Sequence, residues 1–106
     1  MSPSLTREEA ALDELIAVTN DRTIAVLVGR SWHPGTQIVA NRLRDAAEVI
    51  RSVKAVEVDL DSYSEWSRRN RVFGTPCVLV FRDGDLVRRI NGVVGDEDLH
   101  TLLRRD

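Results

Sequence analysis

The sequence predicts an α/β protein built around a mixed sheet. Two short apolar runs rich in β-branched residues, 24–28 and 77–81, have the length of buried strands. Longer segments with apolar residues at helical spacing alternate with further strand-like runs. The resulting element order is α-β-α-β-α-β-β-α, with helices on both faces of the sheet.

The first half of the chain predicts a helix, a strand and a second helix. Ser4 or Thr6 can cap the first helix, which ends near Asn20. Its apolar stripe consists of Leu5, Ala11, Leu12, Leu15 and Ile16. Strand 24–28 then passes through an exposed turn to Pro34, where a long helix starts and continues to about Ile50.

The second half predicts a parallel strand, a short helix, a hairpin and a last helix. Strand 53–60 is expected to run parallel to strand 24–28, because the helix between them is long enough for a crossover. Asp61 or Ser62 is expected to cap a short helix through Asn70. Strand 77–81 turns at residues 83–84 and returns antiparallel over 86–90. The last helix is expected from residue 95 to residues 104–105.

Composition indicates one soluble domain covering residues 1–106. The chain is 42% apolar and 30% charged, which is ordinary for a globular protein. A net charge of -2 provides no overall field for nucleic acid or an anionic membrane, so neither is an expected partner. No run approaches the roughly twenty apolar residues of a membrane span. The N-terminus lacks a signal peptide's pattern, which predicts a cytoplasmic location.

The single cysteine, Cys77, limits the chemistry of the chain. It excludes an intramolecular disulfide and a cysteine-based zinc cluster. We therefore expect no metal and no cofactor.

Several motifs occur in an order that resembles the thioredoxin family. A tryptophan follows the first strand at a helix start, the second strand ends in VDLD, and Gly-Thr-Pro precedes the third. An FRDG hairpin and a glycine before the last helix complete the set. The resemblance covers nearly the whole chain and implies a three-layer α/β/α sandwich with a central mixed sheet of about four strands. The family's additional N-terminal edge strand has no clear counterpart here.

The family's redox motif is absent. The four positions after Trp32 read His33-Pro34-Gly35-Thr36 where thioredoxins carry Cys-Gly-Pro-Cys. Thiol–disulfide exchange needs one thiolate to attack and a second thiol to resolve the mixed disulfide. The family's buried acid would fall at Leu27, which is apolar. Dithiol–disulfide oxidoreductase activity is therefore not expected, and a role in cell redox homeostasis is implied by the family alone.

The family's substrate-contact surface does match. The resemblance implies a cis peptide bond at Thr75–Pro76 and a peptide-binding groove formed by Trp32, His33, Pro34, Gly35, Thr36, Thr75, Pro76, Asn91 and Gly92. The favoured function is a redox-inactive domain that binds a protein or peptide partner, as a co-chaperone or assembly module.

Two alternatives remain at this stage. One is a monothiol oxidoreductase that uses Cys77, with His33 adjusting the ionisation of the thiol. A cysteine inside an apolar strand is more often a small buried side chain with a raised pKa, so no catalytic residue is assigned. The other alternative is a homodimerisation module.

Overall fold

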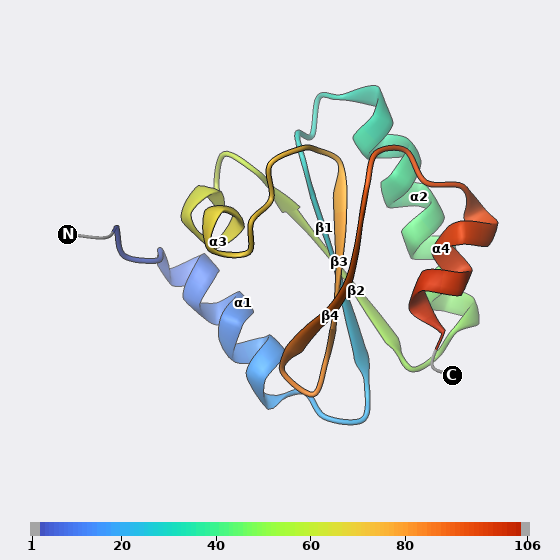
Figure 1. Cartoon of the computed structure of the whole chain (residues 1–106), viewed down its shortest axis with the longest axis horizontal. Coiled ribbons are helices and arrows are strands. Elements are labelled where there is room, and N and C mark those ends of the chain that lie inside the picture. The colour runs from blue at the N-terminus through green and yellow to red at the C-terminus, as the bar shows by residue number, and fades with distance from the viewer. Residues whose placement is uncertain (1–2, 105–106) are drawn as a thin grey trace.

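A computed structural model describes residues 3–104 and contains the eight elements in the predicted order (Figure 1). The helices are α1 (Arg7–Val18), α2 (Pro34–Val49), α3 (Ser64–Arg69) and α4 (Asp96–Leu103). The strands are β1 (Thr23–Gly29), β2 (Val53–Asp59), β3 (Cys77–Arg82) and β4 (Asp85–Asn91). Strand ends differ from the predicted ones by at most one residue, which is within the usual uncertainty of such boundaries.

The four strands form one mixed sheet in the order β2-β1-β3-β4. β1 pairs in parallel with β2 and antiparallel with β3, and β3 pairs antiparallel with β4. Val26, in the middle of β1, lies opposite Val56 on one side and Leu79 on the other. The predicted parallel pair and antiparallel hairpin are thus confirmed. Within residues 3–104 no strand precedes α1, so β2 forms one edge of the sheet.

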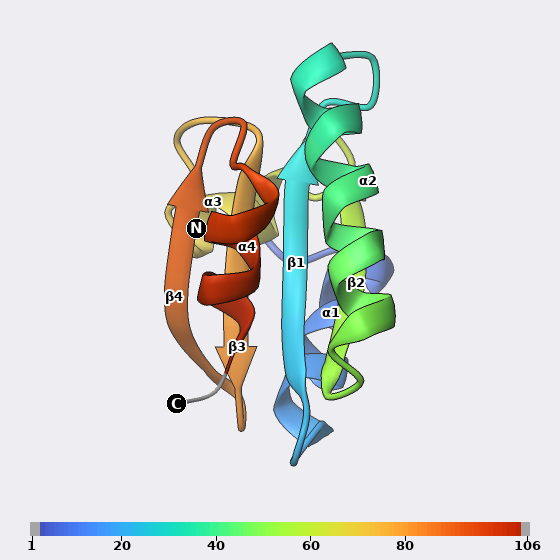
Figure 2. The ribbon, with the colours of Figure 1, turned by 90° about the vertical axis from the view of Figure 1, so that its right-hand side faces the viewer.

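Helices cover both faces of this sheet, which makes three layers. α1 and α3 lie on one face, and α2 and α4 lie on the other (Figures 1 and 2). Because side chains alternate along a strand, Val26 of β1 packs in the α1/α3 cluster and Leu27 packs in the α2/α4 cluster. Every residue of β1 is buried, as predicted for a strand in the centre of a sheet.

The helix starts show where local patterns decided the structure and where they did not. α1 begins with a capping box, in which the Thr6 hydroxyl accepts from the Glu9 N–H and the Glu9 carboxylate accepts from the Thr6 N–H. The predicted caps of α3, Asp61 and Ser62, are wrong. Its N-cap is Tyr63, which makes no side-chain cap hydrogen bond. Glu9 of α1 supplies the acceptor instead, because its second carboxylate oxygen accepts from the Trp66 N–H.

Trp66 anchors the α1/α3 layer. Its side chain is 1% exposed, and its ring centroid lies 6.0 Å from that of Phe81. The indole Nε1–H donates to the Asp13 carboxylate at 2.6 Å. The neighbouring Glu65 carboxylate accepts from the guanidinium groups of Arg68 and Arg69 at 2.7 and 2.8 Å. The carboxylates of Glu9, Asp13 and Glu65 are therefore each hydrogen-bonded within this layer.

Candidate functional site

Three loops meet at one end of the sheet and bring the predicted groove residues together. β1, β2 and β4 run toward this end, and β3 starts from it. The loops consist of residues 30–36, 73–76 and 91–95, and we call them the loop end. In both views of the molecule they gather at the top (Figures 1 and 2). Exposed loops held by a rigid sheet are a common location for binding residues.

The first loop presents Trp32 and holds His33 in place. The Trp32 side chain is 72% exposed, and its ring centroid lies 5.9 Å from that of His33. His33 is the N-cap of α2, because its Nδ1 accepts from the Gly35 N–H at 3.0 Å. This contact requires a lone pair on Nδ1, as in a neutral imidazole protonated on Nε2. The capping role was missed from the sequence, since histidine is not among the preferred N-cap residues.

Gly35 and Thr36 lie beneath the surface of the loop end. A Cβ at Gly35 would approach the Val93 side chain to 3.0 Å, so the first loop packs directly on the third. Thr36 is 8% exposed and sits over Gly29, where a Cβ would lie 2.5 Å from the threonine methyl group. Both predicted groove residues are thus buried beneath the loop end.

The second loop is joined to the third through Pro76. The Thr75–Pro76 peptide bond is cis. The Gly92 N–H donates to the Pro76 carbonyl at 2.8 Å. Gly92 has φ +87, a left-handed conformation that favours glycine. Asn91 lies opposite Cys77 as the last residue of β4. The structure therefore places Pro76, Asn91 and Gly92 side by side.

Thr75 leaves its main chain unpaired at this junction. Neither its N–H nor its carbonyl oxygen forms a hydrogen bond with any residue in the described range 3–104. The residue is half-buried, whereas Gly74 before it is exposed. An unpaired main-chain donor and acceptor on a partly exposed residue is the arrangement that an extended peptide needs for pairing.

Two exposed apolar side chains at the loop end were missed as site residues. Phe73 is 88% exposed and Val93 is 53% exposed. Neither follows a helical or strand period, so the sequence pattern carried no signal for them. The signal that was present is a bulky aromatic residue directly before the Gly-Thr-Pro turn. With Trp32, they give the loop end three exposed large apolar side chains.

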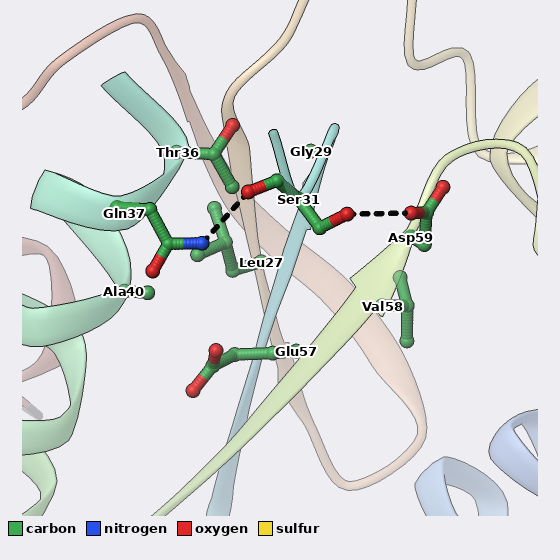
Figure 3. A pocket seen from close by; sticks show the side chains of 9 residues that line it. All are labelled: Leu27, Gly29, Ser31, Thr36, Gln37, Ala40, Glu57, Val58 and Asp59. Carbon is green, nitrogen blue, oxygen red and sulfur yellow. Dashed lines mark hydrogen bonds between the residues drawn. The ribbon is translucent and has the colours of Figure 1, made fainter. Parts of the chain in front are cut away.

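A separate pocket lies beside the loop end, between the start of α2 and the ends of β1 and β2 (Figure 3). Its volume is about 170 Å³, and its lining residues are Leu27, Gly29, Ser31, Thr36, Gln37, Ala40, Glu57, Val58 and Asp59. Gln37 donates to the Ser31 carbonyl at 2.8 Å, and the Ser31 hydroxyl donates to Asp59 at 3.3 Å. The sequence did not predict this pocket, although Leu27 marks the position where the family carries an acid.

The acidic groups around the pocket already have partners. Arg44 binds both carboxylate oxygens of Glu57 at 2.7 Å. Asp59 also accepts from the Asp61 N–H, and Arg30 donates to the Asp61 carboxylate at 2.8 Å. Among residues 3–104 no group of three His, Cys, Asp or Glu side chains is arranged to hold a metal ion.

Cys77 lies inside the protein, on the α1/α3 face of the sheet. It is 0% exposed, so the predicted burial is confirmed. Burial raises the pKa of the Cys77 thiol, and the positive charge of Arg89 opposes this only in part. The thiolate needed for nucleophilic attack is therefore disfavoured. His33, the residue that the monothiol alternative pairs with Cys77, lies in the loop end and caps α2.

Several solved structures with a similar fold are thioredoxins. Fasciola hepatica thioredoxin superposes with a TM-score of 0.79 at 26% identity, over 90% of this chain and 93% of that one. Mitochondrial thioredoxin 3 from Saccharomyces cerevisiae gives 0.79 at 19% identity, over 89% and 86%. Plasmodium falciparum thioredoxin gives 0.79 at 21% identity, over 89% of each chain. The protein has a thioredoxin-like fold. No protein-family model matches the sequence, and no curated protein matches it.

This thioredoxin-like protein lacks the paired cysteines of the CxxC motif. Residues 33–36 read His-Pro-Gly-Thr, and the one cysteine of the sequence is Cys77. The predicted α/β sandwich around a four-stranded mixed sheet is confirmed. Within residues 3–104, none of the helices has the length and hydrophobicity needed to cross a membrane.

Proposed function

We propose that this thioredoxin-like protein is a redox-inactive module that binds an extended segment of a protein partner at the loop end. The observation that carries the proposal is the unpaired main chain of Thr75, in the same group of loops as the exposed Trp32 ring. A partner that forms main-chain hydrogen bonds with Thr75 would gain affinity without depending on its sequence. Trp32 would add a large apolar contact of the kind that dominates binding interfaces. A co-chaperone or assembly module would use such a surface.

The chemistry of the chain supports binding over disulfide exchange. Exchange requires a thiolate and a resolving thiol. The chain has one thiol, which is buried and has a raised pKa. The positions that carry sulfur in thioredoxins instead cap α2, in the case of His33, and pack over Gly29, in the case of Thr36. Both side chains therefore have structural roles in the absence of redox work.

Selection of peptides on the immobilised full chain tests the binding proposal. A phage library of random dodecapeptides should yield binders, whose synthetic versions are then titrated by fluorescence polarisation. Trp32→Ala should weaken their binding about tenfold or more, as expected for an interface hot spot. Val49→Ala is the matched control, because Val49 is also 72% exposed but lies at the end of α2 away from the loop end. Failure to select any peptide, or equal binding by both variants, would contradict the proposal.

An insulin reduction assay tests the absence of redox activity. Wild type should precipitate insulin no faster than the reductant alone. Turnover by wild type that disappears in Cys77→Ser would instead establish a monothiol oxidoreductase.

A further inference from the structure

Phe73 is an exposed aromatic residue outside the set of groove residues that the sequence predicted. At 88% exposed, it is the most exposed large apolar side chain among residues 3–104. It precedes the unpaired Thr75 by two residues in the loop that leads into β3. Burial of an aromatic ring of this size is a large favourable contribution to an interface. Its position in the same loop as Thr75 makes it accessible to whatever pairs there.

The loop that carries Phe73 is fixed at both ends. At its start, the Arg89 guanidinium donates to the carbonyl oxygens of Asn70 and Arg71 at 2.8 Å each. At its end, the Gly92 N–H holds the Pro76 carbonyl. A partner therefore meets a loop that is already positioned, and it loses less free energy to ordering than it would on a free chain.

Arg71 adds an unsatisfied positive charge beside Phe73. Its side chain is exposed and forms no hydrogen bond or ion pair with any other residue that the structure describes. The three loops of the loop end, residues 30–36, 73–76 and 91–95, contain no acidic residue that could pair with it. The charge at this side of the loop end that lacks a complement is therefore positive.

We infer that Phe73 and Arg71 extend the groove past Thr75 and select a partner segment by its side chains. This inference rests on the proposed peptide binding. The occupant is an extended segment of another protein with a large apolar residue and an acidic residue on the Phe73 side of the residue paired with Thr75. Main-chain pairing at Thr75 gives affinity to any extended segment. Phe73 supplies sequence preference through apolar contact, and Arg71 fixes orientation through charge.

The peptides selected on wild type test this inference directly. They should be enriched in a large apolar residue followed or preceded by Asp or Glu on one side of the motif. Phe73→Ser should weaken their binding about tenfold, whereas Phe73→Leu should retain most of it. Arg71→Gln should weaken binding about two- to fivefold at low salt and leave it unchanged at high salt, since exposed ion pairs are screened. Val49→Ser, at the other end of α2, should bind as wild type does.

The outcomes separate this inference from the proposed function. If selected peptides need Trp32 but bind Phe73→Ser and Arg71→Gln as tightly as wild type, the extended groove is refuted and the proposed function stands. If no peptide is selected, both fail. If sedimentation shows a dimer that Phe73→Ser dissociates, the occupant is a second copy and the inference is overturned. Circular dichroism of both variants should match wild type, because the substituted side chains are exposed.

Discussion

The two tryptophans of this chain differ in their burial and in the hydrogen bonding around them. Around Trp66, the ring is buried, the indole N–H is bound by Asp13, and the main-chain N–H is bound by Glu9. Around Trp32, the ring is 72% exposed, and the neighbouring loop carries the unpaired main chain of Thr75. The polar and apolar groups of Trp66 itself are satisfied within the chain, whereas the Trp32 ring is exposed and the Thr75 main chain is unpaired.

This difference separates residues that stabilise the fold from residues that are available for binding. Buried polar groups without partners are costly, so a region built for stability pairs them within the chain. Exposed aromatic side chains contribute little to folding and are characteristic of interaction sites. Substitutions in the Trp66 region should therefore act on the free energy of unfolding, and substitutions at the loop end should act on binding.

Replacement of Trp66 should have the largest effect on stability. Trp66→Ala removes a buried ring that packs against Phe81, and should lower the free energy of unfolding by about 3–5 kcal/mol. Urea unfolding followed by far-ultraviolet circular dichroism measures the change without relying on tryptophan fluorescence. Trp66→Phe retains an aromatic ring but loses the donor to Asp13, so it should lose less. Wild-type stability in Trp66→Ala would refute the division between the two regions.

Loss of the Glu9 carboxylate should have the next largest effect. Glu9→Ala leaves the buried N–H of Trp66 without its acceptor, which should cost about 1–3 kcal/mol. Glu8→Ala is the matched control, because Glu8 is the exposed neighbour in the same helical turn. Equal effects of the two substitutions, measured by the same urea titration, would show that α3 does not depend on α1 for its cap.

Acid should weaken the Trp66 region through its carboxylates. Hydrogen bonds from Arg68 and then Arg69 lower the pKa of Glu65 to about 2. For Glu9, burial favours a higher pKa, but hydrogen bonds from the Thr6 and Trp66 main chain outweigh it and lower the pKa. A lowered pKa in the folded chain means that the ionised group stabilises the fold above the ordinary pKa of about 4.3.

That stabilisation should disappear as the pH falls from about 4.3 toward 2. Urea midpoints measured at stepped pH values should decline across this window. Glu65→Gln should be less stable near neutral pH and show a shallower decline. A profile of Glu65→Gln parallel to that of wild type would exclude a contribution from this carboxylate.

His33 lies in the loop end but should contribute to stability, because it caps α2. His33→Ala removes the acceptor of the Gly35 N–H and should cost about 0.5–2 kcal/mol, the usual range for loss of an N-cap. His33→Asp should restore most of it, since aspartate is a preferred cap. Thermal unfolding of wild type, His33→Ala and His33→Asp ranks their stabilities. An Asp variant as unstable as the Ala variant would show that His33 does not stabilise the protein by capping α2.

Trp32→Ala should have the smallest effect on stability. Its exposed ring should change the free energy of unfolding by no more than about 0.5 kcal/mol, the usual range for surface positions. The same variant should lose peptide binding. A large loss of stability would mean that the Trp32 ring stabilises the fold, and it would contradict the proposed difference between the two tryptophan regions.

The sequence allowed the fold to be predicted because its main signals are local. The apolar runs of β1 and β3 and the periodicity of α2 each lie within one stretch of chain. The cap of α3 could not be predicted, because Glu9 and Trp66 are 57 positions apart. The exposure of Phe73 and the pocket below Ser31 likewise depend on how distant loops meet.

The proximity of the predicted groove residues followed from the resemblance, whereas the exposure of each side chain did not. Trp32 and Pro76 were assigned to the groove by the resemblance to thioredoxins, which rests on their order and spacing along the chain. Gly35 and Thr36 were assigned to the surface by their position in the motif, whereas packing against Val93 and Gly29 buries them. Position along the chain thus predicts which loops meet, and only packing decides which side chains face outward.

The edge strand β2 is a position where protein engineering could add a further strand to the sheet. Lys54 and Glu57 are exposed on this strand, and charged side chains at such a margin oppose association between copies. No strand within residues 3–104 occupies the place beside it. A strand grafted ahead of α1, with residues of opposite charge facing these two, could add to the sheet without displacing any of its existing pairs.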